Sequence, residues 1–236
     1  MRAAFSYFTI LPAGTTAAPD AEALAWLPFV GAVVGALAGG AAYGVSLIGP
    51  HGIAVATAFG LTIVLTGALH LDGFLDCCDA LFASAPPERR LEILKDPRHG
   101  TFALAGFAVA GVAWVAALGA LAPASYPLAL ALSGAAARWS AVIHARWSPY
   151  ARADAPPALA QRPPLAVLAP GGALFLVLAA ALGMSGAVAV LAALVAAAAA
   201  LAFARARLGG GLIGDAYGFA IVVAEIAALS VLAIFP

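Results

Sequence analysis

Long runs of apolar and small residues alternate with short polar segments along the whole chain. The apolar runs cover residues 25 to 49, 52 to 71, 101 to 122, 127 to 145, 165 to 182, 187 to 204 and 216 to 235. Each is close to the roughly 20 residues that an α-helix needs to cross a bilayer. The pattern predicts an all-α, polytopic membrane bundle of about seven spans, within a range of six to eight. Residues 1 to 236 would form a single integral-membrane domain.

Small residues recur at helical spacing in the first of these runs. Gly31, Gly35 and Gly39 follow one another at four-residue intervals. Residues four apart lie on one face of a helix, and small side chains on such a face let two helices approach closely in lipid. We therefore expect this helix to pack tightly against a neighbour.

Composition and net charge narrow the class of protein further. Hydrophobic residues make up 64% of the chain and charged residues 9%, and the mean hydropathy is +1.04. These values exceed those of soluble domains and make the lipid bilayer the expected surroundings. The net charge is zero and no basic stripe is present, so the sequence does not support nucleic-acid binding.

The distribution of Lys and Arg predicts the orientation in the membrane. With seven spans, all eleven of these residues lie in or near loops on one side, whereas the turns around Pro50, Pro123 and Gly183 contain none. Cytoplasmic loops of membrane proteins carry an excess of Lys and Arg. We therefore expect the N-terminus to be cytoplasmic, together with the segment 72–100.

Three aspartates follow the second apolar run. On a helix, Asp72, Asp76 and Asp79 fall within an arc of roughly 60°, because 3.6 residues make one turn. Carboxylate oxygens are preferred ligands of Mg²⁺, which can neutralise phosphate oxygens during group transfer. The alternative is a solvated helix end, but like charges on one face repel each other. We favour a metal or phosphate site, on a helix that continues through 72 to about Ser84.

A short helix from Glu88 to Asp96 is expected next. Glu92 and Asp96 share one of its faces, while Lys95, Arg98 and His99 lie at its end. These residues would form a second wall of the site, in which carboxylates hold metal and basic groups hold phosphate. A salt-bridged surface helix is the alternative interpretation.

Two further segments carry polar groups of interest. Arg138 lies about eight residues inside a span, where it would bind phosphate, pair with a buried acid or extend to the interface. Gly210 and Gly211 precede Asp215, so their amides would face an anion unless they mark only a flexible connection. Asp215 would complete the metal site or bind a ribose or base. Glu225 should face the bundle interior, and His70 is expected to be a satisfied packing residue.

Two blocks of sequence resemble the cobalamin synthase family, also called the adenosylcobinamide-GDP ribazoletransferases. They are Thr66–Gly73 with Asp76 and Asp79, and Arg90–Phe102. The resemblance extends to Phe8–Pro12, Arg138 and Leu208–Asp215, and thus covers most of the chain.

This resemblance implies a reaction late in vitamin B12 assembly. The family joins adenosylcobinamide-GDP and α-ribazole, or its 5′-phosphate, to give adenosylcobalamin, or its 5′-phosphate, and releases GMP with Mg²⁺ as cofactor. Carried over to this chain, the catalytic and metal-binding residues would be Asp72, Asp76 and Asp79, with Glu92 and Asp96 as further metal ligands. The substrate-binding residues would be Lys95, Arg98, Arg138, Gly210, Gly211 and Asp215.

The resemblance also implies the surroundings of the enzyme. It would be a multi-pass protein of the bacterial cytoplasmic (inner) membrane, with its active site facing the cytoplasm. We expect it to form a homo-oligomer or to associate with other cobalamin-assembly enzymes.

Two other functions stay open at this point. A CDP-alcohol phosphotransferase also uses aspartates at a membrane face, but its signature continues with Ala-Arg, whereas this chain has Ala80-Leu81. A secondary transporter would place ionisable groups near the bilayer midplane and would contain repeated halves. Arg138 and Glu225 support it weakly, and no repeat is apparent.

Overall fold

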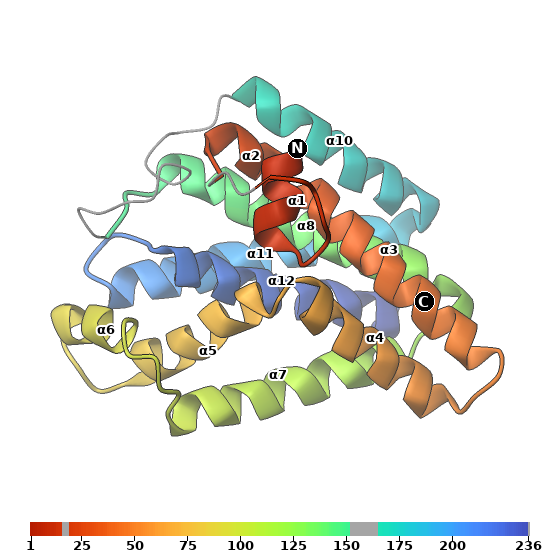
Figure 1. Cartoon of the computed structure of the whole chain (residues 1–236), viewed down its shortest axis with the longest axis horizontal. Helices are drawn as coiled ribbons and strands as arrows, with labels where there is room; N and C mark the ends of the chain where they lie inside the picture. Colours follow the sequence, from red (N-terminus) through yellow and green to blue (C-terminus); the bar gives the residue numbers. More distant parts are fainter. Residues whose placement is uncertain (16–18, 152–164, 236) are drawn as a thin grey trace.

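The computed structural model describes residues 1–15, 19–151 and 165–235, and these residues form an all-α bundle without strands, as predicted (Figure 1). The α-helices are α1 (Arg2–Phe8), α2 (Ala21–Ala25), α3 (Leu27–Ser46), α4 (His51–Leu65), α5 (Leu69–Phe82), α6 (Pro87–Ile93), α7 (Thr101–Gly119), α8 (Tyr126–Trp147), α10 (Leu165–Ala181), α11 (Gly183–Arg207) and α12 (Gly214–Ile234). A 3₁₀ turn, η1 (Pro123–Ser125), precedes α8. Helix α12 contacts α5, α7, α8 and α11 and thus forms the centre of the bundle.

Five of these helices are long and apolar enough to cross a membrane. They are α3, α7, α8 with η1, α11 and α12, and the pair α4 and α5 gives a sixth if it counts as one broken span. Helix α10 is apolar but shorter. Length and composition thus support five or six spans in the described residues, and the count of seven stays a prediction.

Residues 72 to 82 are helical within α5, but the prediction that the second apolar run continues into them as one helix is wrong, because the chain bends by 89° between α4 and α5. Gly67 and Ala68 both adopt positive φ angles, of 58° and 59°. The Gly67 amide donates to the Val64 carbonyl and the Ala68 amide donates to the Ile63 carbonyl. These two hydrogen bonds form a Schellman motif, which ends a helix with glycine at its first left-handed position. Helix α6 also ends earlier than expected, at Ile93 instead of Asp96.

The close packing expected from the glycines of α3 is confirmed, and the partner is α8. A Cβ atom added at Gly31, Gly35 or Gly39 would overlap a backbone carbonyl of α8. Gly40, on the same helix, faces open space. Small residues on α3 therefore allow the two helix backbones to touch, as is common in membrane bundles.

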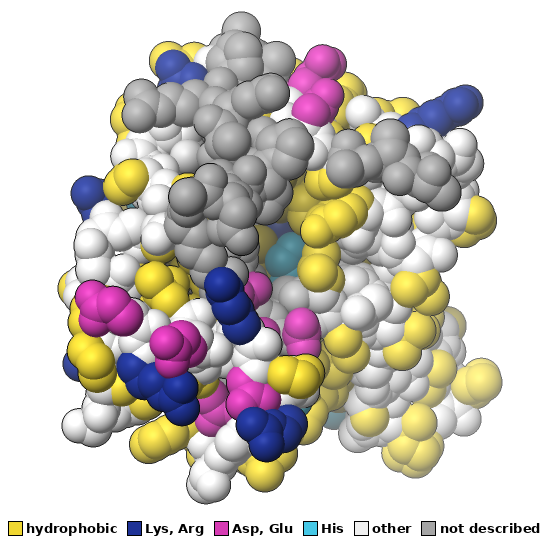
Figure 2. Space-filling view, turned by 60° about the vertical axis from the view of Figure 1, so that its left-hand side comes forward, with side chains coloured by type: hydrophobic (Ala, Val, Ile, Leu, Met, Phe, Trp, Pro, Cys, Tyr) yellow, Lys and Arg dark blue, Asp and Glu magenta, His cyan; other side chains and the backbone are white. Residues whose placement is uncertain are grey.

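Charged side chains gather at one end of the bundle. Helix α6, the first turns of α7 and α12 and the last turns of α8 and α11 all lie at the left of Figure 1. Turned toward the viewer, this end shows acidic and basic side chains close together, below a hollow bordered by hydrophobic atoms (Figure 2). The candidate site lies here.

The packing of α3 on α8 yields a stability prediction. We expect Gly35→Ala to lower the free energy of unfolding by about 2 kcal/mol, because overpacking a tight contact costs roughly 1–3 kcal/mol. Gly40→Ala is the matched control and should leave stability unchanged or slightly raised, since its methyl group meets no atom. Thermal unfolding of both variants in the same detergent measures the difference. Equal melting temperatures would contradict this role of the glycine face.

Candidate functional site

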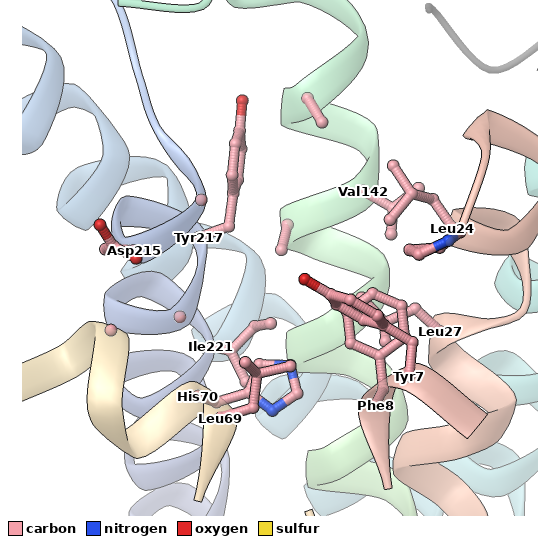
Figure 3. A pocket seen from close by; sticks show the side chains of 16 residues that line it. Tyr7, Phe8, Leu24, Leu27, Leu69, His70, Val142, Asp215, Tyr217 and Ile221 are labelled. Atoms are coloured by element: carbon pink, nitrogen blue, oxygen red, sulfur yellow. The ribbon is translucent and has the colours of Figure 1, made fainter. Parts of the chain in front are cut away.

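Two features share the charged end of the bundle: a cavity of about 190 Å³ between α1, α5, α8 and α12, and a group of acids beside it. Figure 3 shows Phe8, His70 and Asp215 among the side chains around the cavity. Helix α5 contributes to both features, with His70 and Gly73 in the cavity wall and the acids on another face.

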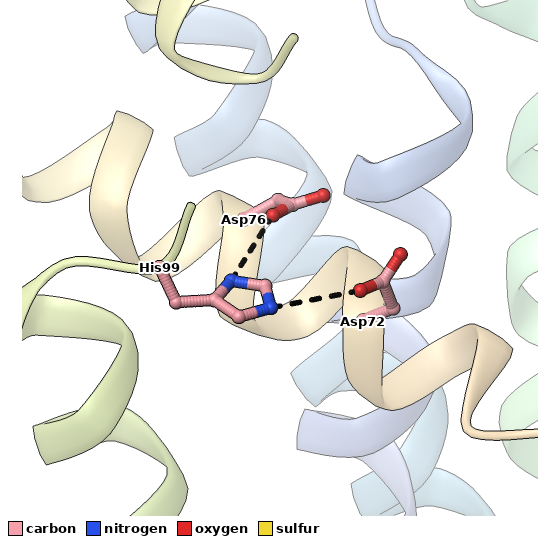
Figure 4. Close-up of side chains that lie close together, drawn as sticks. All are labelled: Asp72, Asp76 and His99. Carbon is pink, nitrogen blue, oxygen red and sulfur yellow. Dashed lines mark ion pairs between the residues drawn. The ribbon is translucent and has the colours of Figure 1, made fainter. Parts of the chain in front are cut away.

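The acid group consists of Asp72, Asp76 and His99. Each offers one ligand atom, and these atoms all lie within 4.8 Å of one another. His99 Nδ1 lies 3.5 Å from Asp76 Oδ1, and His99 Nε2 lies 3.8 Å from Asp72 Oδ1 (Figure 4). The carboxylates come from successive turns of α5, whereas His99 comes from the loop that leads into α7.

Contacts with the first turns of two spans fix the position of α5. Gly73 lies so close to α12 that an added Cβ atom would stand 2.9 Å from the Cα atom of Asp215. Asp79 accepts hydrogen bonds from the backbone amides of Gly100 and Ala103, where α7 begins. The acids of α5 therefore lie at the level where α7 and α12 start, outside the five spanning helices.

The electrostatics of the group favour a bound cation. Partial burial, followed by the neighbouring charges of Asp72 and Asp215, raises the pKa of the Asp76 carboxyl to about 6. Burial disfavours the charged carboxylate, and the nearby negative charges disfavour it further. A divalent cation would relieve this repulsion, and carboxylate oxygens suit Mg²⁺. The nitrogen of His99 suits softer divalent ions better, so the two carboxylates fit Mg²⁺ more closely than the histidine does.

Asp79 is engaged elsewhere. Its two carboxylate oxygens accept the backbone amides at the start of α7, a helix terminus whose first amides have no partner within the helix. The structure thus gives Asp79 a positioning contact and does not bring it into the group formed by Asp72, Asp76 and His99.

The second wall expected after α5 is not assembled either. Glu92 pairs with Arg89, and Asp96 pairs with Arg98 on the exposed surface. Hydrogen bonds from Arg98 lower the pKa of Asp96 to about 2. Lys95 is exposed. The contacts match the alternative of a salt-bridged surface segment, and neither Glu92 nor Asp96 joins the acid group.

The glycine run shapes the connection between α11 and α12. The amide of Gly210 donates to the carbonyl of Arg205, so this amide already has a partner. Gly211 packs against the backbone of Ala151. Asp215, by contrast, lies between the cavity and the acid group: it lines the cavity, and its charge acts on Asp76.

Arg138 is buried and forms an ion pair with Glu225 of α12. It also donates to the carbonyl of Gly134 on its own helix. This is the alternative in which Arg138 pairs with a buried acid, and it also explains how Glu225 is accommodated inside the bundle. Arg138 and Glu225 were the two ionisable residues that weakly supported a transporter, and here they neutralise each other.

Sequence reasoning placed His99 beside Lys95 and Arg98 at the end of the expected short helix but assigned it no role in the site. His99 lies two residues before the third apolar run, which begins at residue 101. The loop that enters this span therefore brings His99 to the same membrane face as the acids. That adjacency was the available signal. His70 also differs from expectation: it is buried, but its Nδ1 atom has no hydrogen-bond partner among the described residues.

Fold and site together define a polytopic helical membrane protein with two carboxylates and a histidine where its spanning helices begin. The model of the cobalamin-5-phosphate synthase family matches residues 1–233, and the chain belongs to this family.

Three relatives are named adenosylcobinamide-GDP ribazoletransferase. The protein of Deinococcus radiodurans is 39% identical over 89% of this chain and 74% of its own length. That of Bradyrhizobium diazoefficiens is 37% identical over 100% and 93%, and that of Pseudomonas paraeruginosa is 35% identical over 98% and 96%. No solved structure matches this chain.

The Arg138–Glu225 pair leads to a second prediction. Arg138→Met should lower the free energy of unfolding by about 3 kcal/mol or more, because it leaves Glu225 buried without its partner. The double variant Arg138→Met with Glu225→Gln should recover most of this loss, since the uncompensated charge is gone. Chemical or thermal unfolding of the single and double variants measures the coupling.

The transferase activity of the double variant then tests whether Arg138 binds substrate, as the family resemblance implies. If Arg138 acts only through Glu225, the double variant should retain the transferase rate of the wild type. A stable double variant without activity would instead support phosphate binding by Arg138.

Proposed function

We propose that this chain joins adenosylcobinamide-GDP and α-ribazole, or its 5′-phosphate, to give adenosylcobalamin, or its 5′-phosphate, and GMP. A ribose hydroxyl oxygen would form the new bond to the phosphorus attached to the corrinoid. The bond from that phosphorus to GMP would break, and the hydroxyl would lose its proton. The observation that carries the proposal is the group of Asp72, Asp76 and His99 in a chain that matches the family over residues 1–233.

Magnesium is the proposed cofactor, held by Asp72 and Asp76. Their side chains offer hard oxygen ligands on adjacent turns, and burial together with the neighbouring negative charges, which a cation would balance, raises the pKa of Asp76. The ion would neutralise phosphate oxygens as the bond to GMP breaks. Asp215 adds a further negative charge beside this pair.

His99 is the residue we assign to accept the proton of the attacking hydroxyl. Its imidazole is partly exposed and lies 3.5 Å from Asp76, which can orient the ring. Lys95 and Arg98 lie on the same loop and are exposed, so substrate phosphates can reach them. Basic groups at this position would attract the charged nucleotide and align it with the acids.

The third prediction tests the acid group directly. Asp76→Asn should reduce GMP release by about 100-fold or more, since it removes a charge that acts on the transition state in a partly dehydrated place. Purified protein in lipid nanodiscs, supplied with adenosylcobinamide-GDP, α-ribazole and Mg²⁺, provides the assay.

Glu88→Gln is the matched control, because Glu88 is an exposed residue of α6 and is not part of the group. It should leave the rate unchanged. A properly folded Asp76→Asn protein with the rate and magnesium dependence of the wild type would exclude the proposed role of α5.

We expect the protein to lie in the inner membrane of a bacterium, with the site on the cytoplasmic side. At the charged end, α6 and the last turns of α8 and α11 carry Arg90, Arg146, Arg205 and Arg207, and segments rich in Lys and Arg are retained on the cytoplasmic side. The apolar helices support a multi-pass arrangement.

A fourth prediction concerns this orientation. In whole cells, Met184→Cys should react with a membrane-impermeant maleimide, because Met184 is exposed at the opposite end of the bundle. Lys95→Cys should react only after the cells are opened. The two native cysteines are buried and should contribute little background. Labelling of Lys95→Cys from outside would reverse the proposed topology.

A further inference from the structure

The cavity beside the acid group is largely apolar. Phe8 of α1, Val142 of α8 and Ile221 of α12 form much of its wall (Figure 3). Phe8 and His70 lie nearly parallel, with ring planes 15° apart and centroids 6.1 Å apart. A flat, mainly apolar ring would therefore find complementary surfaces in this cavity.

His70 provides a polar group inside this apolar cavity. The residue is 7% exposed, and its Nδ1 atom, which is itself buried, has no hydrogen-bond partner in the described part of the chain. A buried polar atom without a partner is costly, so such atoms usually meet a ligand or water. An imidazole nitrogen that carries hydrogen can donate one hydrogen bond to a ring nitrogen.

The volume of the cavity indicates which part of the substrates it can hold. A cavity of about 150 Å³ accepts benzene in an engineered protein, so the volume of about 190 Å³ suits a small ring system. It is too small for a corrinoid macrocycle. A guanine base would need several hydrogen-bond partners around its edge, whereas the walls here are mostly apolar.

We propose that this cavity binds the flat bicyclic base of the ribazole substrate, with His70 donating to the free ring nitrogen of that base. Ribazole is a riboside of a benzimidazole, whose fused ring is apolar and whose second ring nitrogen accepts one hydrogen bond. The inference rests on the proposed function and adds to it the binding site of one substrate.

The position of the cavity agrees with this assignment. Gly73 lies in the cavity wall and is next to Asp72 in the chain, and Asp215 lines the cavity while its charge acts on Asp76. A ribose attached to a base in the cavity would therefore pass Asp215 and present its hydroxyls toward Asp76 and His99. Asp215 is placed to accept a hydrogen bond from the ribose, a role that carboxylates perform well.

The fifth prediction concerns the binding of α-ribazole, measured without the transfer reaction. Ala145 lies in the cavity wall on α8, and Ala145→Leu should fill part of the space. We expect equilibrium dialysis of α-ribazole against protein in nanodiscs to show affinity weakened by about tenfold or more. Ala180→Leu makes the same change at an exposed position of α10 and should bind α-ribazole like the wild type.

A second variant addresses the histidine and covers a failure of Ala145→Leu to fold. His70→Phe keeps an aromatic ring in the cavity but removes the nitrogen, so it should weaken α-ribazole binding by about tenfold. The Michaelis constant for adenosylcobinamide-GDP should stay unchanged in both variants. A purely structural role of His70 would not produce this separation.

Several outcomes would overturn the proposal. They are wild-type affinity for α-ribazole in both variants, absence of α-ribazole binding by the wild type, and a change only in the lipid that copurifies, which would assign the cavity to an acyl chain. The proposed reaction fails separately if the wild type binds α-ribazole in a cavity-dependent way but releases no GMP from adenosylcobinamide-GDP.

Discussion

The break between α4 and α5 is the constraint on which the site depends, because a chain can leave helical geometry within a membrane bundle only where its backbone groups find partners. Gly67 and Ala68 supply two of these hydrogen bonds through the Schellman motif. The amide of Ile10 supplies another, to the carbonyl of Leu65. The N-terminal segment thus helps to close the break, and α5 can leave at 89° to α4 and carry its acids to the first turns of α7 and α12.

The same cost of burying unsatisfied polar groups explains how charge is distributed. Asp72 and Asp76 lie where the spans begin, so they can carry charge that attracts a cation and phosphate. Arg138 and Glu225 lie deeper, where a single charge would be expensive, and they neutralise each other. One set of charges is thus available for ligands and the other is used in packing α8 against α12.

Most of the fold follows from the apolar runs, since a helix of sufficient length is the simplest way to satisfy a backbone in lipid. The glycine face of α3 and the clustering of Asp72 with Asp76 could also be predicted from helical spacing. The break could have been suspected from Gly67, a residue typical of helix ends, but its position inside an apolar run favoured a single helix. His99 and the cavity depend on which loops and helices meet in space. Arg89 and Glu92 pair at helical spacing within α6, whereas the pairing of Asp96 with Arg98 depends on where α6 ends, and spacing alone does not determine it.

The contact between Gly73 and Asp215 joins the two halves of the site. Because glycine has no side chain, α5 can lie directly on the first turn of α12. Around α5, His70, Gly73 and Asp76 follow one another at about 60° intervals, since three residues advance a helix by 300°. The same stretch of helix therefore presents a histidine to the cavity, a flat surface to α12 and a carboxylate to the acid group. A larger residue at position 73 would separate α5 from α12 and so move the acid group and the cavity wall together.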